Sequence, residues 1–304
     1  MEPTLIRTTP TGAAAALAAN VVWGLGNVII VRVPLGGLGL AFHRLWMGGL
    51  IYLIVLYASG GRLTSASFRL GYKGALAFAA DICTFFLAVK HTTLADATTI
   101  SALQPVVIAL FAGAVFGERI QRRHVWATAI ALIGIIAVVQ GSRSTGRVTA
   151  FGEIMAVLGL AAWAWYFIAS KTARQTLDTL EYMTVVMIVG FVAVAPFALI
   201  SGQAMGSGYG GLHLNSLVWV LMVVIFPGSG HLLINWAHSH TTIMLTSLST
   251  LLMPVISTAA AAVFIDQPVN ATQMVGIAIV LIALAVVIIG DTRSARSTAA
   301  TVPT

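Results

Sequence analysis

The residue of this sequence with the strongest claim to a chemical role is Asp81, a carboxylate near the middle of a long apolar stretch. Such a residue costs about 2.5–3.5 kcal/mol on membrane-insertion scales, so it marks a functional position unless its surroundings compensate the charge. Three roles are open: binding an ammonium group of a ligand, exchanging a proton, or joining a polar seam between helices. Phe78 and Phe85 lie at i−3 and i+4, so we expect this helix face to combine the acid with two aromatic rings at a ligand site.

A second set of polar residues lies on one face of the first apolar stretch. Asn20, Trp23 and Asn27 follow each other at helical spacing, so their side chains point the same way. Polar amides avoid lipid, and this face is therefore expected to point into the protein. We expect Trp23 to line a ligand cavity and Asn20 to form a hydrogen bond between helices. For Asn27 both roles are open.

Aromatic residues gather in the stretch that contains Trp163. Trp and Tyr usually lie at membrane interfaces. However, Trp163 lies near the middle of its apolar stretch, and Trp23 lies near the middle of the first apolar stretch. Rings at that depth can clamp an aromatic or cationic ligand, and we expect Trp163 and Tyr166 to do so. Trp165, two positions from Trp163, is expected to face lipid.

Three further apolar stretches combine a proline with nearby polar side chains. Residues 227–231 (P-G-S-G-H) predict a broken helix, because Pro and Gly weaken backbone hydrogen bonding, which membranes tolerate only beside protein or water. His231 is then a candidate ligand contact or hinge residue, with a structural hydrogen bond as the alternative. Gln104 and Ser249, which precede the other two prolines, are further candidates for lining a cavity.

The composition indicates a membrane protein. Of the 304 residues, 59% are hydrophobic and 8% are charged, against about 25% charged residues in a typical soluble domain. The net charge of +7 does not indicate nucleic acid, because the basic residues are spread over short gaps between apolar stretches. The single cysteine, Cys83, excludes an internal disulfide and a paired-cysteine metal site. No phosphate-binding loop is present, so neither ATP nor another cofactor is expected.

Ten apolar stretches are long enough to cross a bilayer as helices. They are 12–31, 38–57, 71–89, 95–116, 124–140, 151–170, 182–200, 215–236, 243–265 and 272–290. The segments 1–11 and 291–304 are polar tails that are expected to be disordered. The predicted fold is therefore all-α, embedded in membrane lipid.

The basic residues predict the orientation of these helices. With the N-terminus inside, most of the 16 Lys and Arg residues fall on the inner side. Those assigned to the outer side are Arg32, Arg44, Lys90, Arg143 and Arg147. The excess of positive charge inside places both termini in the cytoplasm and the protein in the inner membrane.

An internal repeat divides the chain. Residues 88–106 and 237–255 match at a constant offset of 149 positions, including the prolines Pro105 and Pro254. Trp23 corresponds to Trp163 at an offset of 140. We therefore expect two five-helix units, 12–141 and 142–290. Because five is odd, the second unit is expected to be inverted relative to the first, an architecture that places a ligand site between the halves.

Several short stretches resemble a known family. They are 20–24 (N-V-V-W-G), 104–106 (Q-P-V), 116–120 (F-G-E-R-I) and 134–135 (G-I). Together with the repeat they resemble the EamA-type branch of the drug/metabolite transporter superfamily, and within it the YddG-like exporters of aromatic amino acids. The resemblance implies a ten-helix exporter with a central cavity open alternately to either side. The sequence departs from the family pattern at one point: the position that corresponds to Glu118 in the second repeat is occupied by Gln267, where the family often has an acid.

The resulting functional hypothesis is export of amino acids, with aromatic ones favoured and other small metabolites as further substrates. A multidrug or cationic-compound exporter is the alternative. A channel is disfavoured because a repeat within one chain argues for alternating access. An intramembrane enzyme is disfavoured because no Ser-His pair, aspartate pair or metal set is apparent. Proton exchange and passive efflux both stay open. We expect a monomer, with a dimer as the alternative.

Overall fold

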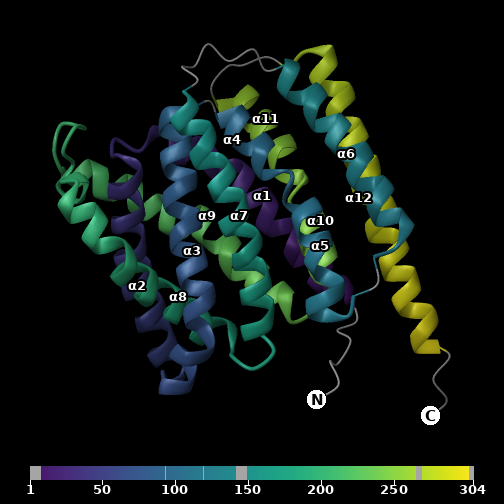
Figure 1. Ribbon diagram of the computed structural model, residues 1–304, viewed down its shortest axis with the longest axis horizontal. Helices are drawn as coiled ribbons and strands as arrows, with labels where there is room; N and C mark the ends of the chain where they lie inside the picture. Colours follow the sequence, from purple (N-terminus) through teal and green to yellow (C-terminus); the bar gives the residue numbers. More distant parts are fainter. Residues whose placement is uncertain (1–7, 93, 119, 142–148, 265–268, 301–304) are drawn as a thin grey trace.

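The computed structural model describes residues 8–92, 94–118, 120–141, 149–264 and 269–300. Within these ranges the structure is helical, as the sequence predicts (Figure 1). The α-helices are α1 (Pro10–Arg32), α2 (Gly37–Ala58), α3 (Ser65–His91), α4 (Leu94–Ser101), α5 (Gln104–Phe116), α6 (Arg122–Gly141), α7 (Ala150–Ala173), α8 (Thr179–Ile200), α9 (Leu214–His238), α10 (Ile243–Ser249), α11 (Leu252–Phe264) and α12 (Ala271–Ala300). A short 3₁₀ helix, Gln203–Met205, follows α8.

Each predicted span coincides with a helix or with a pair of short helices. Within the described ranges, nine segments are long and apolar enough to cross a membrane, and they include all the predicted spans except the one formed by α6. The chain is thus a multi-pass membrane protein, and the count of ten crossings stays a prediction. The basic residues Arg143 and Arg147 and the repeat position Gln267 lie outside the described residues.

The two proline-containing spans of the repeat are each broken in the middle. In the first, α4 ends at Ser101 and α5 begins at Gln104. In the second, α10 ends at Ser249 and α11 begins at Leu252. Because proline lacks an N–H and crowds the preceding turn, the chain makes a turn just before Pro105 and Pro254 instead of continuing the helix. Both breaks occur at the matching point of the repeat.

The helix break predicted at 227–231 is wrong, because α9 runs through Pro227 without interruption. The glycines of this region serve close packing against α1 instead. A Cβ atom on Gly230 would lie 2.6 Å from Nε1 of Trp23, and one on Gly26 would lie 2.6 Å from Cβ of Pro227. The small residues therefore let α1 and α9 approach closely, as small residues do between membrane helices.

The most extensive helix contacts join the two halves of the chain. They pair α1 with α9, α3 with α7, α2 with α8 and α6 with α12. The α6–α12 pair lies at one side of the molecule in Figure 1. These two helices cross at Gly134 and Gly276, where a Cβ on either glycine would meet the carbonyl oxygen of the other.

The end of α3 lies beside both α1 and α7. Nζ of Lys90 donates a hydrogen bond to the carbonyl oxygen of Val33, just after α1, at 2.7 Å. Thr149, just before α7, donates from its hydroxyl to the carbonyl oxygen of His91 at 2.6 Å. Consequently α1 ends and α7 begins at the end of α3.

The end of α9 shows the reciprocal arrangement. Thr9, just before α1, donates from its hydroxyl to the carbonyl oxygen of His240 at 3.1 Å. Lys171, near the end of α7, donates to the carbonyl oxygen of His238 at 3.3 Å. Here α1 begins and α7 ends, so these two helices run in opposite directions.

The C-terminal segment departs from the expected disordered tail, because α12 continues to Ala300. Asp291 is buried and anchors this part of the helix to α6. Its carboxylate lies 2.7 Å from the Arg123 guanidinium and 2.9 Å from Nε2 of His124. These contacts hold α12 against α6 at the point where its apolar stretch ends.

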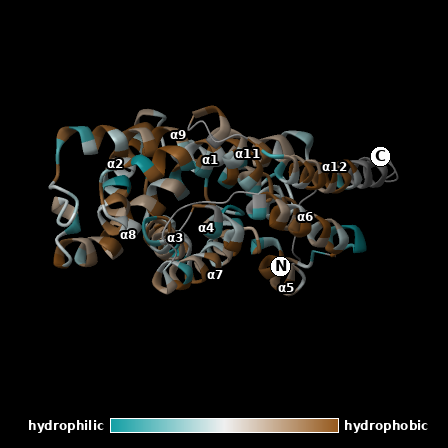
Figure 2. Ribbon diagram, turned by 90° about the horizontal axis from the view of Figure 1, so that it is seen from above, coloured by the Kyte–Doolittle hydropathy of each residue, from teal (hydrophilic) through white to brown (hydrophobic). Residues whose placement is uncertain are grey.

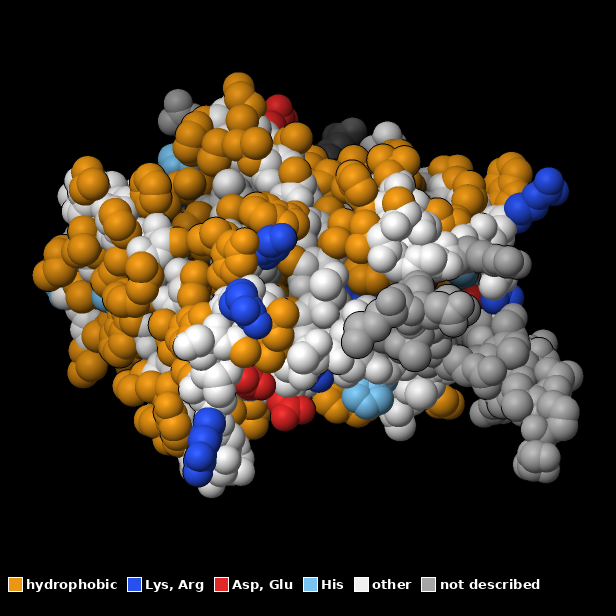
Figure 3. All heavy atoms as spheres, turned by 60° about the horizontal axis from the view of Figure 1, so that its bottom comes forward, with side chains coloured by type: hydrophobic (Ala, Val, Ile, Leu, Met, Phe, Trp, Pro, Cys, Tyr) orange, Lys and Arg blue, Asp and Glu red, His pale blue; other side chains and the backbone are white. Residues whose placement is uncertain are grey.

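The exterior of the bundle is apolar. Seen from above, hydrophobic residues predominate on the outer helices (Figure 2). Figure 3 shows hydrophobic side chains over much of one face, with Lys and Arg side chains scattered among them. Trp165 is 47% exposed on this exterior, which confirms that it faces outward. Lipid is the solvent that stabilises such a surface.

Candidate functional site

A cavity lies between the two halves of the chain. It contains about 530 Å³ of space free of protein atoms, including the part open to the surroundings. Its lining residues are Trp23, Asn27, Ile30, Arg44, Asp81, Ile82, Phe85, Phe86, Ser101, Trp163, Pro227, His231 and Met253. It extends from the middle of the bundle, at both helix breaks, toward the end where α1 and α3 terminate.

Six of the ten predicted site residues line this cavity. They are Trp23, Asn27, Asp81, Phe85, Trp163 and His231. Their convergence from α1, α3, α7 and α9 is decided by the helix pairing described above. The other four, Phe78, Gln104, Tyr166 and Ser249, do not line it.

Aromatic rings form the inner wall of the cavity. Trp23 and Trp163 meet edge to face, with ring centroids 6.0 Å apart and planes at 76°. The His231 ring lies against Trp23 at 4.7 Å between centroids. This geometry gives a flat apolar ligand two indole surfaces and one imidazole edge to contact.

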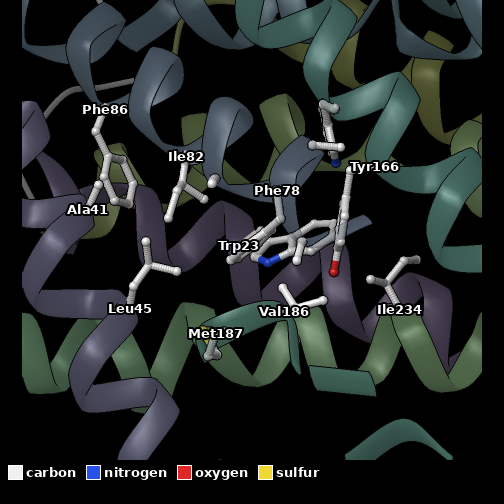
Figure 4. Packing of buried hydrophobic residues seen from close by; sticks show 14 of the residues in the cluster. Trp23, Ala41, Leu45, Phe78, Ile82, Phe86, Tyr166, Val186, Met187 and Ile234 are labelled. Carbon is white, nitrogen blue, oxygen red and sulfur yellow. The ribbon is translucent and has the colours of Figure 1, made fainter. Parts of the chain in front are cut away.

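Phe78 and Tyr166 form a layer behind this wall. Both side chains are fully buried, and their ring centroids are 5.0 Å apart (Figure 4). Phe78 also contacts His231, at 4.9 Å between centroids. The Tyr166 hydroxyl accepts a hydrogen bond from Nδ2 of Asn235 at 2.6 Å. We assign both residues to support of the wall.

The predicted amide and hydroxyl side chains occupy different positions relative to the cavity. Asn20 donates to the Ser249 hydroxyl at 2.9 Å, which confirms that Asn20 joins helices and places Ser249 in the same seam. Asn27 lines the cavity and also donates to the Ser257 hydroxyl at 3.0 Å. It therefore combines the two expected roles, lining the cavity and forming a hydrogen bond between helices. Gln104 is fully buried between the two helix breaks, where its Oε1 accepts from Thr250 at 3.4 Å.

Arg44 is the residue that our reading of the sequence missed. We counted it among the basic residues of the outer side, as a topology signal, but it lies within the first half of α2 and is 3% exposed. Its guanidinium carbon is 5.4 Å from the centroid of Phe78 and 5.6 Å from that of Phe86. A charged residue inside the apolar stretch 38–57 was the available signal, by the same argument that singled out Asp81.

Arg44 and Asp81 attract each other electrostatically, but neither side chain has a hydrogen-bond or ion-pair partner among the described residues. No described group accepts a hydrogen bond from the Arg44 guanidinium, and its Nε atom is buried without one. The Asp81 carboxylate, on a residue that is 9% exposed overall, has no ion pair within 4.0 Å among the described residues. Cation–π contacts contribute about 2 kcal/mol each when desolvated, whereas burying an unpaired charge costs several kcal/mol. The cavity therefore holds a basic and an acidic side chain that favour further polar contacts.

A polar network lies at the opposite end of the bundle. Nζ of Lys171 is buried and donates to the carbonyl oxygen of Thr241 at 2.6 Å. It also lies 3.6 Å from the carboxylate of Glu118. That carboxylate accepts from the backbone N–H groups of Ile243 and Met244 at 2.8 and 3.2 Å, which caps α10. This Lys171–Glu118 network joins the ends of α5, α7, α9 and α10.

The described residues offer no group of three or more His, Cys, Asp or Glu side chains that could hold a metal ion. The arrangement suits recognition of a small amphiphilic molecule, because charged groups and aromatic surfaces face one cavity.

The comparison with protein families decides the class of the chain. The model of the EamA-like transporter family matches residues 10–140 and again residues 150–289. The chain belongs to the EamA-like transporter family. The family match recurs in both halves, and the resemblance of the short stretches to this family is confirmed.

Curated relatives agree with this assignment. The chain is 24% identical, over 90% of its length and 94% of theirs, to a protein of Salmonella typhimurium named "Probable amino-acid metabolite efflux pump". A protein of Escherichia coli with the same name is 23% identical over the same shares. The "Pseudopaline exporter CntI" of Pseudomonas aeruginosa is 24% identical over 62% of this chain and 65% of its own. All three relatives are named as efflux pumps or exporters.

A solved structure shows the same fold. A crystal structure of a protein that is 18% identical superposes with a TM-score of 0.75. The match covers 92% of this chain and 98% of that one. The helical arrangement is thus one already observed in an experimental structure.

Proposed function

We propose that this EamA-like transporter exports amino acids, with aromatic ones favoured, from the cytoplasm across the inner membrane. The observation that carries the proposal is the contact of Trp23 and Trp163 at the wall of a cavity between the two halves. Efflux relatives named for amino-acid metabolites support the substrate class. Two indole rings at the inner wall favour an aromatic side chain.

Transport in this proposal proceeds by alternating access between two inverted repeats. The opposite directions of the equivalent helices α1 and α7 support the inversion. The cavity reaches toward the end of α1, while the Lys171–Glu118 network closes the other end. With the N-terminus in the cytoplasm, the cavity faces outward and the network is the cytoplasmic seal. Rocking of one repeat against the other would exchange these two states.

A multidrug or cationic-compound exporter is the second candidate. Asp81 beside aromatic rings favours it, because such a site attracts a hydrophobic cation. Arg44 in the same cavity disfavours it, because a cation bound there would be repelled.

The proposal is tested by counterflow in liposomes that contain the purified protein. Labelled phenylalanine, tryptophan and threonine are measured with and without a pH gradient, beside a lipophilic cation. We expect saturable exchange, fastest for the aromatic amino acids, and reduced exchange in Trp163→Ala. Acceleration by the pH gradient that Asp81→Asn removes would assign proton coupling. Exchange of the cation alone, with folded protein, would contradict the amino-acid assignment.

A further inference from the structure

A basic and an acidic side chain enter the cavity from neighbouring helices of the first half. Arg44 belongs to α2 and Asp81 to α3, and both line the cavity. We propose that Arg44 binds the carboxylate and Asp81 the ammonium group of a free α-amino acid, so that the transporter selects zwitterions. This inference rests on the proposed amino-acid transport and names the two substrate groups that the site recognises.

The incomplete hydrogen bonding of Arg44 is the first support. Its side chain is 3% exposed, yet no described residue accepts a hydrogen bond from its guanidinium. The guanidinium carbon lies over the rings of Phe78 and Phe86, at 5.4 and 5.6 Å from their centroids. A phenyl ring offers no oxygen acceptor, so the guanidinium N–H groups can still donate to a carboxylate.

The separation of the two charges is the second support. A mutual ion pair between Arg44 and Asp81 would satisfy both, but their charged atoms do not approach within 4.0 Å. Each group is thus available to a ligand in a cavity that they share. Arg also suits a carboxylate better than Lys would, since its planar fork matches both oxygens.

A zwitterion is the ligand class that this pair of charges favours. A carboxylic acid without an amine would be attracted by Arg44 and repelled by Asp81. An amine without a carboxylate would be attracted by Asp81 and repelled by Arg44. An α-amino acid carries both charges on one carbon, so both residues attract it. Its side chain would then contact the aromatic wall that includes Trp163 of the second half. A bound amino acid would in this way connect the two halves.

The test measures how well three unlabelled compounds compete with labelled phenylalanine in counterflow. They are phenylalanine itself, phenylalaninamide, which lacks the carboxylate, and 3-phenylpropionate, which lacks the ammonium group. For the wild-type protein we expect phenylalanine to compete at least about tenfold better than either analogue, because each analogue loses one charged hydrogen bond. Arg44→Gln should weaken phenylalanine and leave phenylalaninamide unchanged. Asp81→Asn should weaken phenylalanine and leave 3-phenylpropionate unchanged.

Matched controls remove a charge outside the cavity. Arg32→Gln changes an exposed arginine at the end of α1, and Asp178→Asn changes the residue before α8. Both should keep the wild-type order of competition. If a cavity variant transports too slowly, the three compounds are titrated by quenching of tryptophan fluorescence in detergent, after gel filtration shows folded protein.

The outcomes separate the two proposals. Wild-type exchange of phenylalanine without preference over its analogues would overturn the zwitterion inference alone. So would cavity variants that weaken all three compounds equally, which indicates a structural role for both charges. Absence of any amino-acid exchange by the wild-type protein would overturn the proposed function, and the inference with it.

Discussion

Trp23 and Trp163, which correspond to each other in the internal repeat, meet edge to face with ring centroids 6.0 Å apart. They come from α1 and α7, which run in opposite directions. Residues that correspond in two halves can meet only near the place where the halves face each other. Both rings also line the cavity, so the repeat and the candidate site coincide at this contact.

Replacement of Trp163 should weaken the binding of aromatic amino acids. Trp163→Ala removes an indole surface from the cavity, and an aromatic contact of this kind is worth about 0.5–1.5 kcal/mol beyond its buried area. We expect the apparent affinity for tryptophan to fall at least about threefold, measured by counterflow at several concentrations. Trp165→Ala, on the exposed side of the same helix, is the control and should leave it unchanged. Equal losses in both variants would contradict a binding role for Trp163.

Close packing of α1 and α9 should make Gly230 intolerant of a side chain. In Gly230→Ala the new methyl group would lie 2.6 Å from Nε1 of Trp23 and 3.0 Å from the carbonyl oxygen of Ala19. We expect a loss of about 1–3 kcal/mol in stability, seen as a lower melting temperature in detergent.

Gly228→Ala is the matched control for this prediction, two positions away on the same helix. Its nearest new contact would be the carbonyl oxygen of Val223 at 3.4 Å, an ordinary distance. It should melt close to the wild-type temperature. The same melting temperature for both variants would show that α1 and α9 do not depend on this close approach.

The Lys171–Glu118 network should control access at its end of the bundle. Glu118→Gln keeps the size of the side chain but removes the charge that faces buried Lys171 at 3.6 Å. In a Cys83→Ser background with His240→Cys as reporter, we expect several-fold faster reaction with a thiol reagent applied from the cytoplasmic side. Glu153→Gln, exposed in the first turn of α7, is the control. Unchanged reactivity in Glu118→Gln would show that the network is not a seal.

The predicted orientation is checked by two cysteines on opposite sides, again in the Cys83→Ser background. Ser207 is exposed between α8 and α9, and Ser59 is exposed after α2. With both termini in the cytoplasm and ten crossings, a membrane-impermeant reagent should label Ser207→Cys in intact cells from outside. Ser59→Cys should react only after the cells are opened. The reverse pattern would place the termini outside.

Helices were predictable because crossing a bilayer demands long apolar stretches, whatever the helices pack against. The helix breaks at Pro105 and Pro254 were harder to predict from the sequence. A proline leaves two outcomes open, a break or a continuous helix, as at Pro227 in α9. In α9 the helix continues, and the proline ring packs closely against Gly26 of α1.

Among the candidate site residues, the sequence identified those whose polarity or depth was unusual, such as Asp81, Trp23 and Trp163. The sequence could not separate residues lining the cavity from residues one layer behind it, since Phe78 and Phe85 share a helix face with Asp81 but only Phe85 reaches the cavity. Arg44 was missed because basic residues were read as topology signals, and only its burial in α2 showed otherwise.

The sequence by itself determined that this protein lies in a membrane, is helical, and contains a repeat of residues such as Pro105 and Pro254. These properties follow from local composition and spacing, which hold before the chain folds. Only the tertiary structure decided that Arg44, Asp81 and Trp163 share one cavity and that Lys171 and Glu118 lie at the closed end. Contacts between helices distant in the chain set these distances, and apolar stretches of similar composition do not specify which of them pair.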